Sequence, residues 1–255
     1  MFPPLAGSKA IRAATEHREQ WPLPASPWLM VQSWYKLLFA HWPVPVTMLR
    51  PHIPASLTID TFDGEAWLGV VPFEIRGMRM RGLPPLPGFN GFPELNVRTY
   101  VTHEDKPGVW FFSLDADHAL AVMGARLFFR LPYFKAKMRV QAEGAQVRYD
   151  SQRTHPGAAP AVFRASYRPV SEIYYSQPGT LDYWLTERYY LYTADKRGRV
   201  YRGPIHHHPW PLQRAEAEIE QETTAASHGL RLPDTPPLLH YADLKDVLIW
   251  MIERV

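Results

Sequence analysis

The sequence predicts a mainly β protein of the α+β class, with only a few short helices. The chain of 255 residues contains 26 prolines, 13 tyrosines, 12 phenylalanines and 9 tryptophans, a composition that favours short strands and turns over long helices. Apolar and polar residues alternate over many short segments, which is the period of a half-buried strand. Turn residues such as Asp63-Gly64 separate these segments.

In the first half of the chain, we interpret residues 1–27 as a polar N-terminal arm and 28–255 as one domain. The arm contains a short helix around residues 9–20. Residues 28–44 form a strand or an amphipathic entry segment, and the three prolines in 45–57 predict a short helix followed by a turn. Residues 57–75 are two strands around the Asp63-Gly64 turn. The Pro/Gly-rich residues 81–93 are a loop placed to cover a site.

In the second half, residues 94–104 and 109–116 alternate like strands, and 115–130 have helical spacing with Asp115 or Asp117 as the N-cap. Three further strands are expected within residues 131–170. A short helix is expected within 176–190, and a hairpin within 189–208 turns at "DKRG". Residues 211–230 are ambiguous but helical by propensity, and the chain closes with a loop and a terminal strand.

The composition excludes several function classes. The formal net charge is +3, and the basic residues are scattered, so no nucleic-acid partner is expected. Cysteine is absent, which excludes disulfides, thiolate metal sites and a cysteine nucleophile. No segment has the length and apolarity of a membrane span or signal peptide, so we expect a cytoplasmic protein without a membrane partner. Motifs of serine hydrolases, dinucleotide-binding enzymes and P-loop NTPases are also absent.

The strand "ELNVRTYV" carries the first candidate site. Its alternation places Glu94, Asn96, Arg98 and Tyr100 on one face and apolar side chains on the other. Neighbours on one face lie about 7 Å apart, so an acid, an amide and a guanidinium can contact one small ligand. Alternation alone is equally satisfied by a solvated face with cross-strand ion pairs.

Two lysines form a second candidate. Lys135 and Lys137 share one face if "LPYFKAKM" is a strand. A lysine in apolar surroundings or beside another cation has a lowered pKa and can attack carbonyls as a free amine. The alternative is a pair of exposed strand lysines, the usual environment of this residue.

Histidines form a third candidate, in "PIHHHPW". His206 and His208 would share a strand face and could bind a metal, with His41, His103 or His240 as remote partners. The alternative is histidines that pack and hydrogen-bond in a loop before a proline. Glu187 and Arg188 are adjacent in "LTERYYLY", which favours a structural clamp over a catalytic pair.

Long segments from about His41 to the C-terminus resemble the YqjF-like family, a domain of unknown function. That family is in turn similar to the acetoacetate decarboxylase-like superfamily. The resemblance implies a closed, cone-shaped antiparallel β-barrel with a few flanking helices and an internal cavity. It is carried by the following segments: "HWPVPVTMLRPHIPASLTIDTFDGEAWLGVVPF", "ELNVRTYV", "KPGVWFFSLDADHALAV", "ARLFFRLPYFKAKM", "LTERYYLY" and "HHHPWPLQRAEAEI".

The resemblance also implies site residues. In the decarboxylase a lysine forms a Schiff base with a β-keto acid, and a second lysine lowers its pKa. Lys135 is in the matching position, but Ala136 replaces the second lysine. Glu94 in "FPE" resembles a glutamate of the decarboxylase pocket. An arginine also lines that pocket, and our own interpretation of the strand suggests Arg98 or Arg50 for it.

The leading hypothesis is therefore a cavity that binds a small keto acid or carbonyl metabolite and, if active, transforms it as a lyase. Lys135 and Glu94 would be catalytic, and Arg98, Asn96, Tyr100 and Tyr133 would bind the substrate. No cofactor or metal is expected, and a homo-oligomer is compatible with the resemblance. Three alternatives stay open: a binding protein without catalysis, a metal enzyme built on His206 and His208, and a structural or partner-binding protein.

Overall fold

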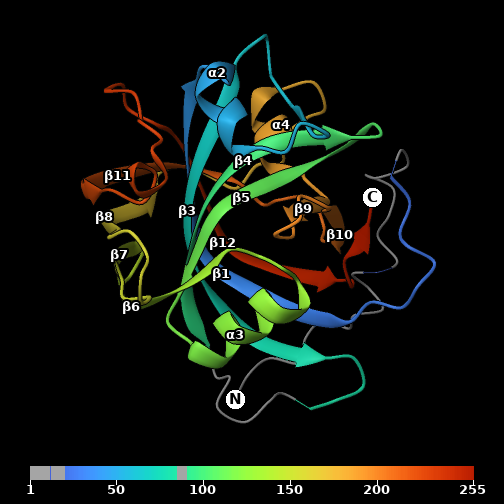
Figure 1. Ribbon diagram of the computed structural model, residues 1–255. Coiled ribbons are helices and arrows are strands. Elements are labelled where there is room, and N and C mark those ends of the chain that lie inside the picture. The colour runs from blue at the N-terminus through green and yellow to red at the C-terminus, as the bar shows by residue number, and fades with distance from the viewer. Residues whose placement is uncertain (1–11, 13–20, 85–90) are drawn as a thin grey trace.

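A computed structural model describes residue 12, residues 21–84 and residues 91–255 (Figure 1). Most of the predicted arm, and residues 85–90 of the predicted loop, lie outside this part. The prediction of a single domain from residue 28 stays a prediction. Within the described part no helix is both long and apolar enough to cross a membrane.

The described chain is mainly β with a few short helices, as the sequence predicts. Its segments are β1 (Met30–Val44), α2 (Val46–Leu49), the 3₁₀ helix η2 (Arg50–His52), β2 (Thr58–Ile59), β3 (Ala66–Met80), β4 (Phe92–His103), β5 (Lys106–Ala116), α3 (Ala119–Phe128), β6 (Tyr133–Glu143), β7 (Gln146–Arg153), β8 (Val162–Pro169), α4 (Leu181–Thr186), β9 (Tyr190–Ala194), β10 (Val200–His206), β11 (Gln213–Glu222), the 3₁₀ helix η3 (Ala226–His228), β12 (Leu238–Ile249) and β13 (Glu253–Arg254).

The described strands form one thirteen-stranded sheet with the order β13-β10-β9-β5-β6-β7-β8-β11-β12-β1-β3-β4-β2. Additional pairings join β4 to β5 and β10 to β12, so strands that are not neighbours in this order also pair with each other. The expected antiparallel arrangement holds for most pairs, but β5 pairs in parallel with both β6 and β9. The closed, cone-shaped barrel stays a prediction.

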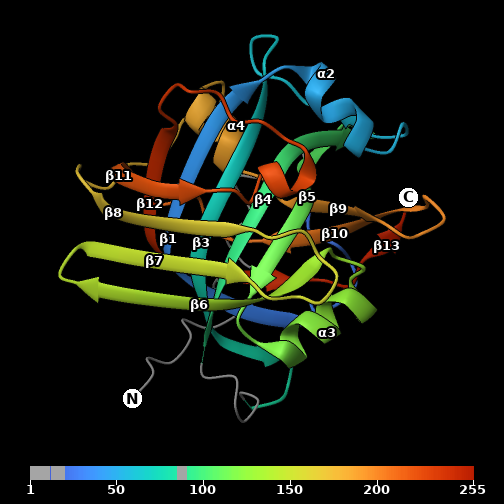
Figure 2. The ribbon, with the colours of Figure 1, turned by 60° about the vertical axis from the view of Figure 1, so that its left-hand side comes forward.

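Strand β4 is buried on both of its faces, and this decides the question raised by its alternation. Strands β6, β7, β8 and β11 lie side by side and cross in front of β1, β3, β4 and β5 (Figure 2). Leu95 and Val97 of β4 pack in the core shared with Tyr149 and Phe163 of this layer. The polar side chains of β4 therefore point to the opposite side, toward the interior of the curved sheet.

Several local predictions are confirmed. The Asp63-Gly64 turn has positive φ at both residues, 50° and 84°, and Phe62 and Glu65 pair across it. This is the conformation that Asp-Gly favours in tight hairpins. A short helix follows Pro45, and a second begins at Leu181.

Two local predictions are wrong. Residues 213–222 form strand β11 and not a helix, because every second residue is more buried on one face of the sheet. Helix α3 is capped by His118, whose Nδ1 accepts a 3.2 Å hydrogen bond from the Ala121 amide. Asp115 lies inside β5 and forms a buried ion pair with Arg153 at 2.8 Å. Its carboxylate is therefore bound to Arg153 in the core and does not cap the helix.

Candidate functional site

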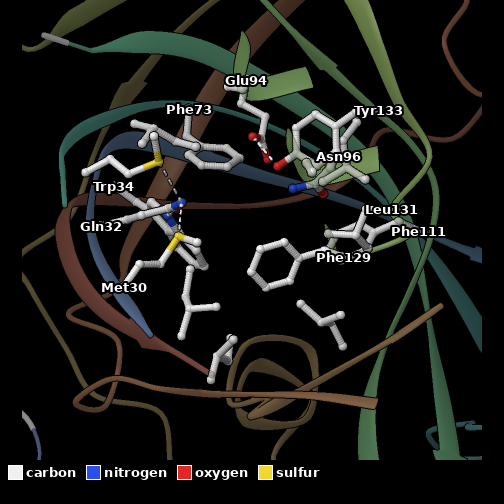
Figure 3. Close-up of a pocket in the computed structure, with 18 of the residues that line it drawn as sticks. Met30, Gln32, Trp34, Phe73, Glu94, Asn96, Phe111, Phe129, Leu131 and Tyr133 are labelled. Atoms are coloured by element: carbon white, nitrogen blue, oxygen red, sulfur yellow. Dashed lines mark hydrogen bonds between the residues drawn. The ribbon is translucent and has the colours of Figure 1, made fainter. Parts of the chain in front are cut away.

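A cavity of about 550 Å³ lies inside the curved sheet. Strands β1, β3, β4 and β5 supply much of its wall, and one face of α3 supplies another part. Most lining side chains are aliphatic, aromatic or thioether groups, among them Trp34, Phe73, Phe111 and Phe129 (Figure 3). A largely apolar chamber of this size that contains a few polar groups is typical of small-molecule sites.

Glu94 and Tyr133 form a polar pair in this wall. Tyr133 Oη donates a 2.7 Å hydrogen bond to Glu94 Oε2, and the two side chains point toward each other (Figure 3). Glu94 is only 3% exposed. Burial, opposed by the Tyr133 hydrogen bond and reinforced by nearby Asp115, raises the pKa of Glu94 to about 8. The carboxyl group is therefore mostly protonated at neutral pH and can donate a proton.

Asn96 and Arg98 continue the same face of β4 along the cavity wall. Arg98 forms no ion pair with any described residue, although its guanidinium lies 5.4 Å from the Phe39 ring and 5.8 Å from the Tyr100 ring. Arg98 Nε and Asn96 Oδ1 are buried and have no hydrogen-bond partner among the described residues. Buried polar atoms are rarely left in this state, so two residues of the cavity wall hold unsatisfied polar atoms.

Arg188 adds a second guanidinium to the wall. Its NH1 group donates to Asp60 Oδ2 at 2.6 Å, and its Nε donates to the Trp184 carbonyl at 2.6 Å. The plane stacks 4.3 Å from the Trp184 ring. Its NH2 group is buried and has no hydrogen-bond partner among the residues that the structure describes. These contacts fix the guanidinium and leave one donor nitrogen unused.

Tyr100 lies on the same strand but is not part of the cavity lining. Its hydroxyl donates to the Leu185 carbonyl at 2.9 Å and lies 2.7 Å from His41 Nε2. Since the phenol proton is used on Leu185, His41 Nε2 must be the donor in the second contact. Burial, with the charges of Arg98 and His240, lowers the pKa of His41, which agrees with a neutral ring. Tyr100 therefore has a structural role next to the cavity wall and does not line the cavity.

One side of the chamber is built from thioether groups and small residues. Gln32 Nε2 lies 3.5 Å from both Met30 Sδ and Met78 Sδ (Figure 3). Helix α3 contributes the small residues Ala121, Gly124 and Ala125 to the wall, and a Cβ atom added at Gly124 would meet no atom within 4 Å. Flexible methionine side chains adapt to differently shaped apolar ligands.

The other predicted site residues lie elsewhere. Lys135 is exposed on β6 and absent from the cavity wall, because β6 leaves β5 after this residue and pairs with β7. Arg50 donates to the carbonyls of Ile53, Pro54 and Leu57 and so braces its own turn. Within the described residues no lysine lines the cavity. The structure therefore does not bring Lys135 to Glu94, and the imine role of Lys135 is withdrawn.

The histidine hypothesis also fails on geometry. Strand β10 ends at His206, which is fully buried, whereas His208 is exposed, so the two do not share a strand face. No group of three or more His, Asp or Glu side chains arranged to hold a metal occurs in the part of the chain that the structure describes. His207, between them, lines the cavity.

Comparison with known proteins agrees with this architecture. The model of a family described as "Uncharacterized conserved protein", DUF2071, matches residues 31–246. The chain belongs to the DUF2071 family. Its relatives include the uncharacterized protein YqjF of Bacillus subtilis (strain 168), which is 51% identical over 232 residues, covering 91% of this chain and 95% of YqjF. The YqjF-like resemblance is thereby confirmed.

Several solved structures share the fold of this DUF2071 chain. The enduracididine biosynthesis enzyme MppR with HEPES bound superposes with a TM-score of 0.61 at 12% identity, covering 90% of this chain and 88% of MppR. MppR complexed with pyruvate gives 0.58 at 12% identity, over 92% and 93% of the two chains. Acetoacetate decarboxylase from Legionella pneumophila gives 0.58 at 12% identity, over 92% and 93%. At such identities the likeness shows a shared fold.

One feature of the site was missed by sequence reasoning. Arg188 was assigned to a structural clamp, yet it also lines the cavity. Its neighbour Glu187 is indeed a clamp, because it accepts hydrogen bonds from Tyr189 Oη at 2.5 Å and from the Trp210 amide at 2.8 Å. The opposite orientations of two adjacent residues follow from the end of α4 at Thr186, which no local pattern specifies.

Proposed function

We propose that this protein binds a small molecule with an apolar body and a carboxylate or carbonyl oxygen. The observation that supports the proposal is the set of unpartnered donors and acceptors in an apolar chamber. Arg98 Nε, Arg188 NH2 and Asn96 Oδ1 belong to residues of its wall and have no hydrogen-bond partner in the described chain. An oxygen anion bound beside either guanidinium group would supply an opposite charge.

The balance of charge supports an anionic ligand. No carboxylate pairs with Arg98 in the described chain, and Glu94 is mostly protonated at neutral pH because its pKa is about 8. In a chamber of low dielectric constant, a charge-assisted hydrogen bond to a carboxylate is about twice as strong as a neutral one. MppR, which shares the fold, has been solved with pyruvate bound. The cavity of about 550 Å³ leaves room for an apolar body behind the anionic group.

Binding can be tested with matched pairs of ligands. Calorimetry would compare keto acids of increasing apolar size, with the carbonyl next to the carboxylate or farther from it, against the corresponding amides. We expect saturable binding of the acids, and at least about tenfold weaker binding of each amide and of any acid to Arg98→Met. Arg168→Met, an exposed arginine on β8 with 56% side-chain exposure, is the control. Equal affinity of acid and amide would contradict the proposal.

A second function, proton transfer on the bound carbonyl compound, is favoured by the Glu94–Tyr133 pair. The carboxylate of ionised Glu94 would take a proton from the carbon next to the carbonyl, and the electron pair of that C–H bond would move onto the carbonyl oxygen as an enolate. Arg98 or Arg188 would stabilise this oxygen. Return of the proton to carbon completes the cycle without any other reactant.

This second function has its own measurement. In D₂O, NMR would follow loss of the α-hydrogen signal of a keto acid already shown to bind. Exchange should increase with pH until Glu94 is ionised near pH 8, as its raised pKa requires. Glu94→Gln should abolish exchange and change affinity by less than about threefold. Tight binding without catalysed exchange would indicate a binding protein that lacks this activity. Exchange that is unchanged in Glu94→Gln would exclude Glu94 as the base.

A further inference from the structure

A second concave surface, of about 600 Å³, lies between the α3–β6 connection and the turn of the β9–β10 hairpin. We call it the basic groove. It shares only Leu131 with the wall of the cavity. Its lining residues are Arg126, Arg130, Leu131, Pro132, Phe134, Ala194, Asp195, Lys196, Arg197 and Arg199. Five cations from two separate segments thus face one carboxylate.

That single carboxylate is already fully used. Asp195 accepts a 2.7 Å hydrogen bond from Arg199 Nε, and the Arg197 and Arg199 amides donate to its other oxygen at 2.9 Å and 3.1 Å. These contacts hold the pKa of Asp195 at about 2, although partial desolvation opposes the shift. Asp195 therefore shapes the hairpin turn and neutralises Arg199, and no described acidic group forms an ion pair with the other four cations.

Arg130 and Arg126 are held in place by contacts that leave their positive charges without a neutralising carboxylate. The Arg130 carbonyl accepts a 2.7 Å hydrogen bond from Thr193 Oγ1, and its guanidinium stacks 4.8 Å from the Tyr201 ring. Arg126 NH1 donates at 2.6 Å to the Tyr133 carbonyl. In the described part of the chain, Arg130, Lys196 and Arg197 lie within 4.0 Å of no acidic group. Like charges converging from two segments repel one another, and an anion between them relieves that repulsion.

We propose that the basic groove binds a small molecule that carries two or more phosphate groups. Multiple guanidinium groups match phosphate oxygens by bidentate hydrogen bonds, and a flexible lysine adds a point charge. A monocarboxylate would neutralise one of these cations, whereas a diphosphate matches the groove's excess of charge. The inference is independent of the proposed function of the cavity, because Leu131 is the one described residue that lines both sites and no charged side chain lines both.

The test measures binding of inorganic pyrophosphate and of ADP by calorimetry on the full chain. The key variant is Arg130→Gln with Arg197→Gln, and Lys196→Gln is a second variant in an exposed turn. Arg126 is left unchanged because its hydrogen bond to Tyr133 lies close to the cavity. Arg231→Gln, exposed and remote in sequence from the groove, is the matched control for the loss of positive charge.

We expect both ligands to bind saturably with one site per chain. The double variant should weaken binding at least about tenfold, and Arg231→Gln should change it less than about twofold. Equal affinity for pyrophosphate and ADP would show that phosphate alone is recognised, and tighter ADP binding would add a nucleoside contact. The proposal would be overturned by no binding of either ligand, by equal losses in the double variant and the control, or by binding of single-stranded RNA alone.

Discussion

Tyr133 from β6 donates a 2.7 Å hydrogen bond to Glu94 from β4, and burial raises the pKa of both groups. The carboxyl group and the phenol therefore meet as two neutral acids at pH 7 inside an apolar wall. A neutral carboxylic acid can donate as well as accept a hydrogen bond, which an ionised one cannot. The pair thus gives the cavity a proton donor at neutral pH and a base at higher pH.

Glu94→Gln should reveal this protonation through stability. The folded pKa of about 8 exceeds the usual 4.5, so the folded state holds a proton that the unfolded state releases between these values. This contribution to stability is complete below about pH 4.5 and is lost as pH rises through about 8. Between these pH values, the free energy of unfolding of the natural protein should fall by a few kcal/mol relative to that of Glu94→Gln. Each unit of pKa shift corresponds to about 1.4 kcal/mol. Denaturant titrations across this range measure the difference, and a difference independent of pH would contradict it.

Arg98→Met should separate binding from stability. Arg98 Nε is buried without a partner, and no carboxylate in the described chain pairs with its guanidinium. An apolar side chain of similar length removes that unsatisfied group and keeps the contact with Phe39. We expect stability to be unchanged or to increase by about 1–2 kcal/mol, while carboxylate affinity falls. Thermal unfolding with and without ligand tests this, and a strongly destabilised variant would assign Arg98 a structural role.

Gly124 offers a way to change the size of the chamber. It lies within α3, where glycine is less stable than alanine by about 0.5–1 kcal/mol, and an added Cβ meets open space. Gly124→Ala should therefore stabilise the protein by about this amount. Gly124→Leu should exclude the larger ligands of a series and keep the smaller ones. Unchanged affinity for every ligand with Gly124→Leu would show that α3 does not bound the binding space.

The buried ion pair of Asp115 and Arg153 should be structural. It joins β5 to β7 at 2.8 Å, and both side chains are at most 2% exposed. Removing one partner leaves a buried charge unpaired, so Asp115→Asn should cost about 3–5 kcal/mol in urea unfolding. Asp150→Asn, which breaks half-exposed pairs at 3.6 Å and 3.7 Å, should cost less than about 1 kcal/mol. Similar costs would contradict the assignment.

Much of the fold could be predicted because local patterns agree with the sheet. The alternation of β4, the Asp63-Gly64 turn and the two short helices appear where the sequence indicates. The failure at β11 has a clear cause. Ala and Glu favour a helix when isolated, but pairing with β8 and β12 makes this segment a strand whose alternate residues Ala215, Ala217 and Ile219 pack against the core.

The site was predicted only in part because it depends on where strands diverge. Alternation identified Glu94, Asn96 and Arg98 as one face, and the curvature of the sheet makes that face part of the cavity wall. The same rule applied to Lys135 failed, since Tyr133 points into the cavity while β6 turns outward two residues later. The basic groove was invisible in the sequence, because Arg130 and Arg197 are far apart along the chain.

The spacing of Glu94 and Arg98 on one strand has a consequence for selectivity. Four residues of a β-strand span about 13 Å between Cα atoms, and Asn96 occupies the midpoint. An acid whose carbonyl adjoins its carboxylate engages Arg98 and Glu94 together only where the two side chains lean toward each other along the strand. A molecule that carries these groups at its two ends matches the spacing of the Cα atoms. Discrimination among acids would then depend on molecular length.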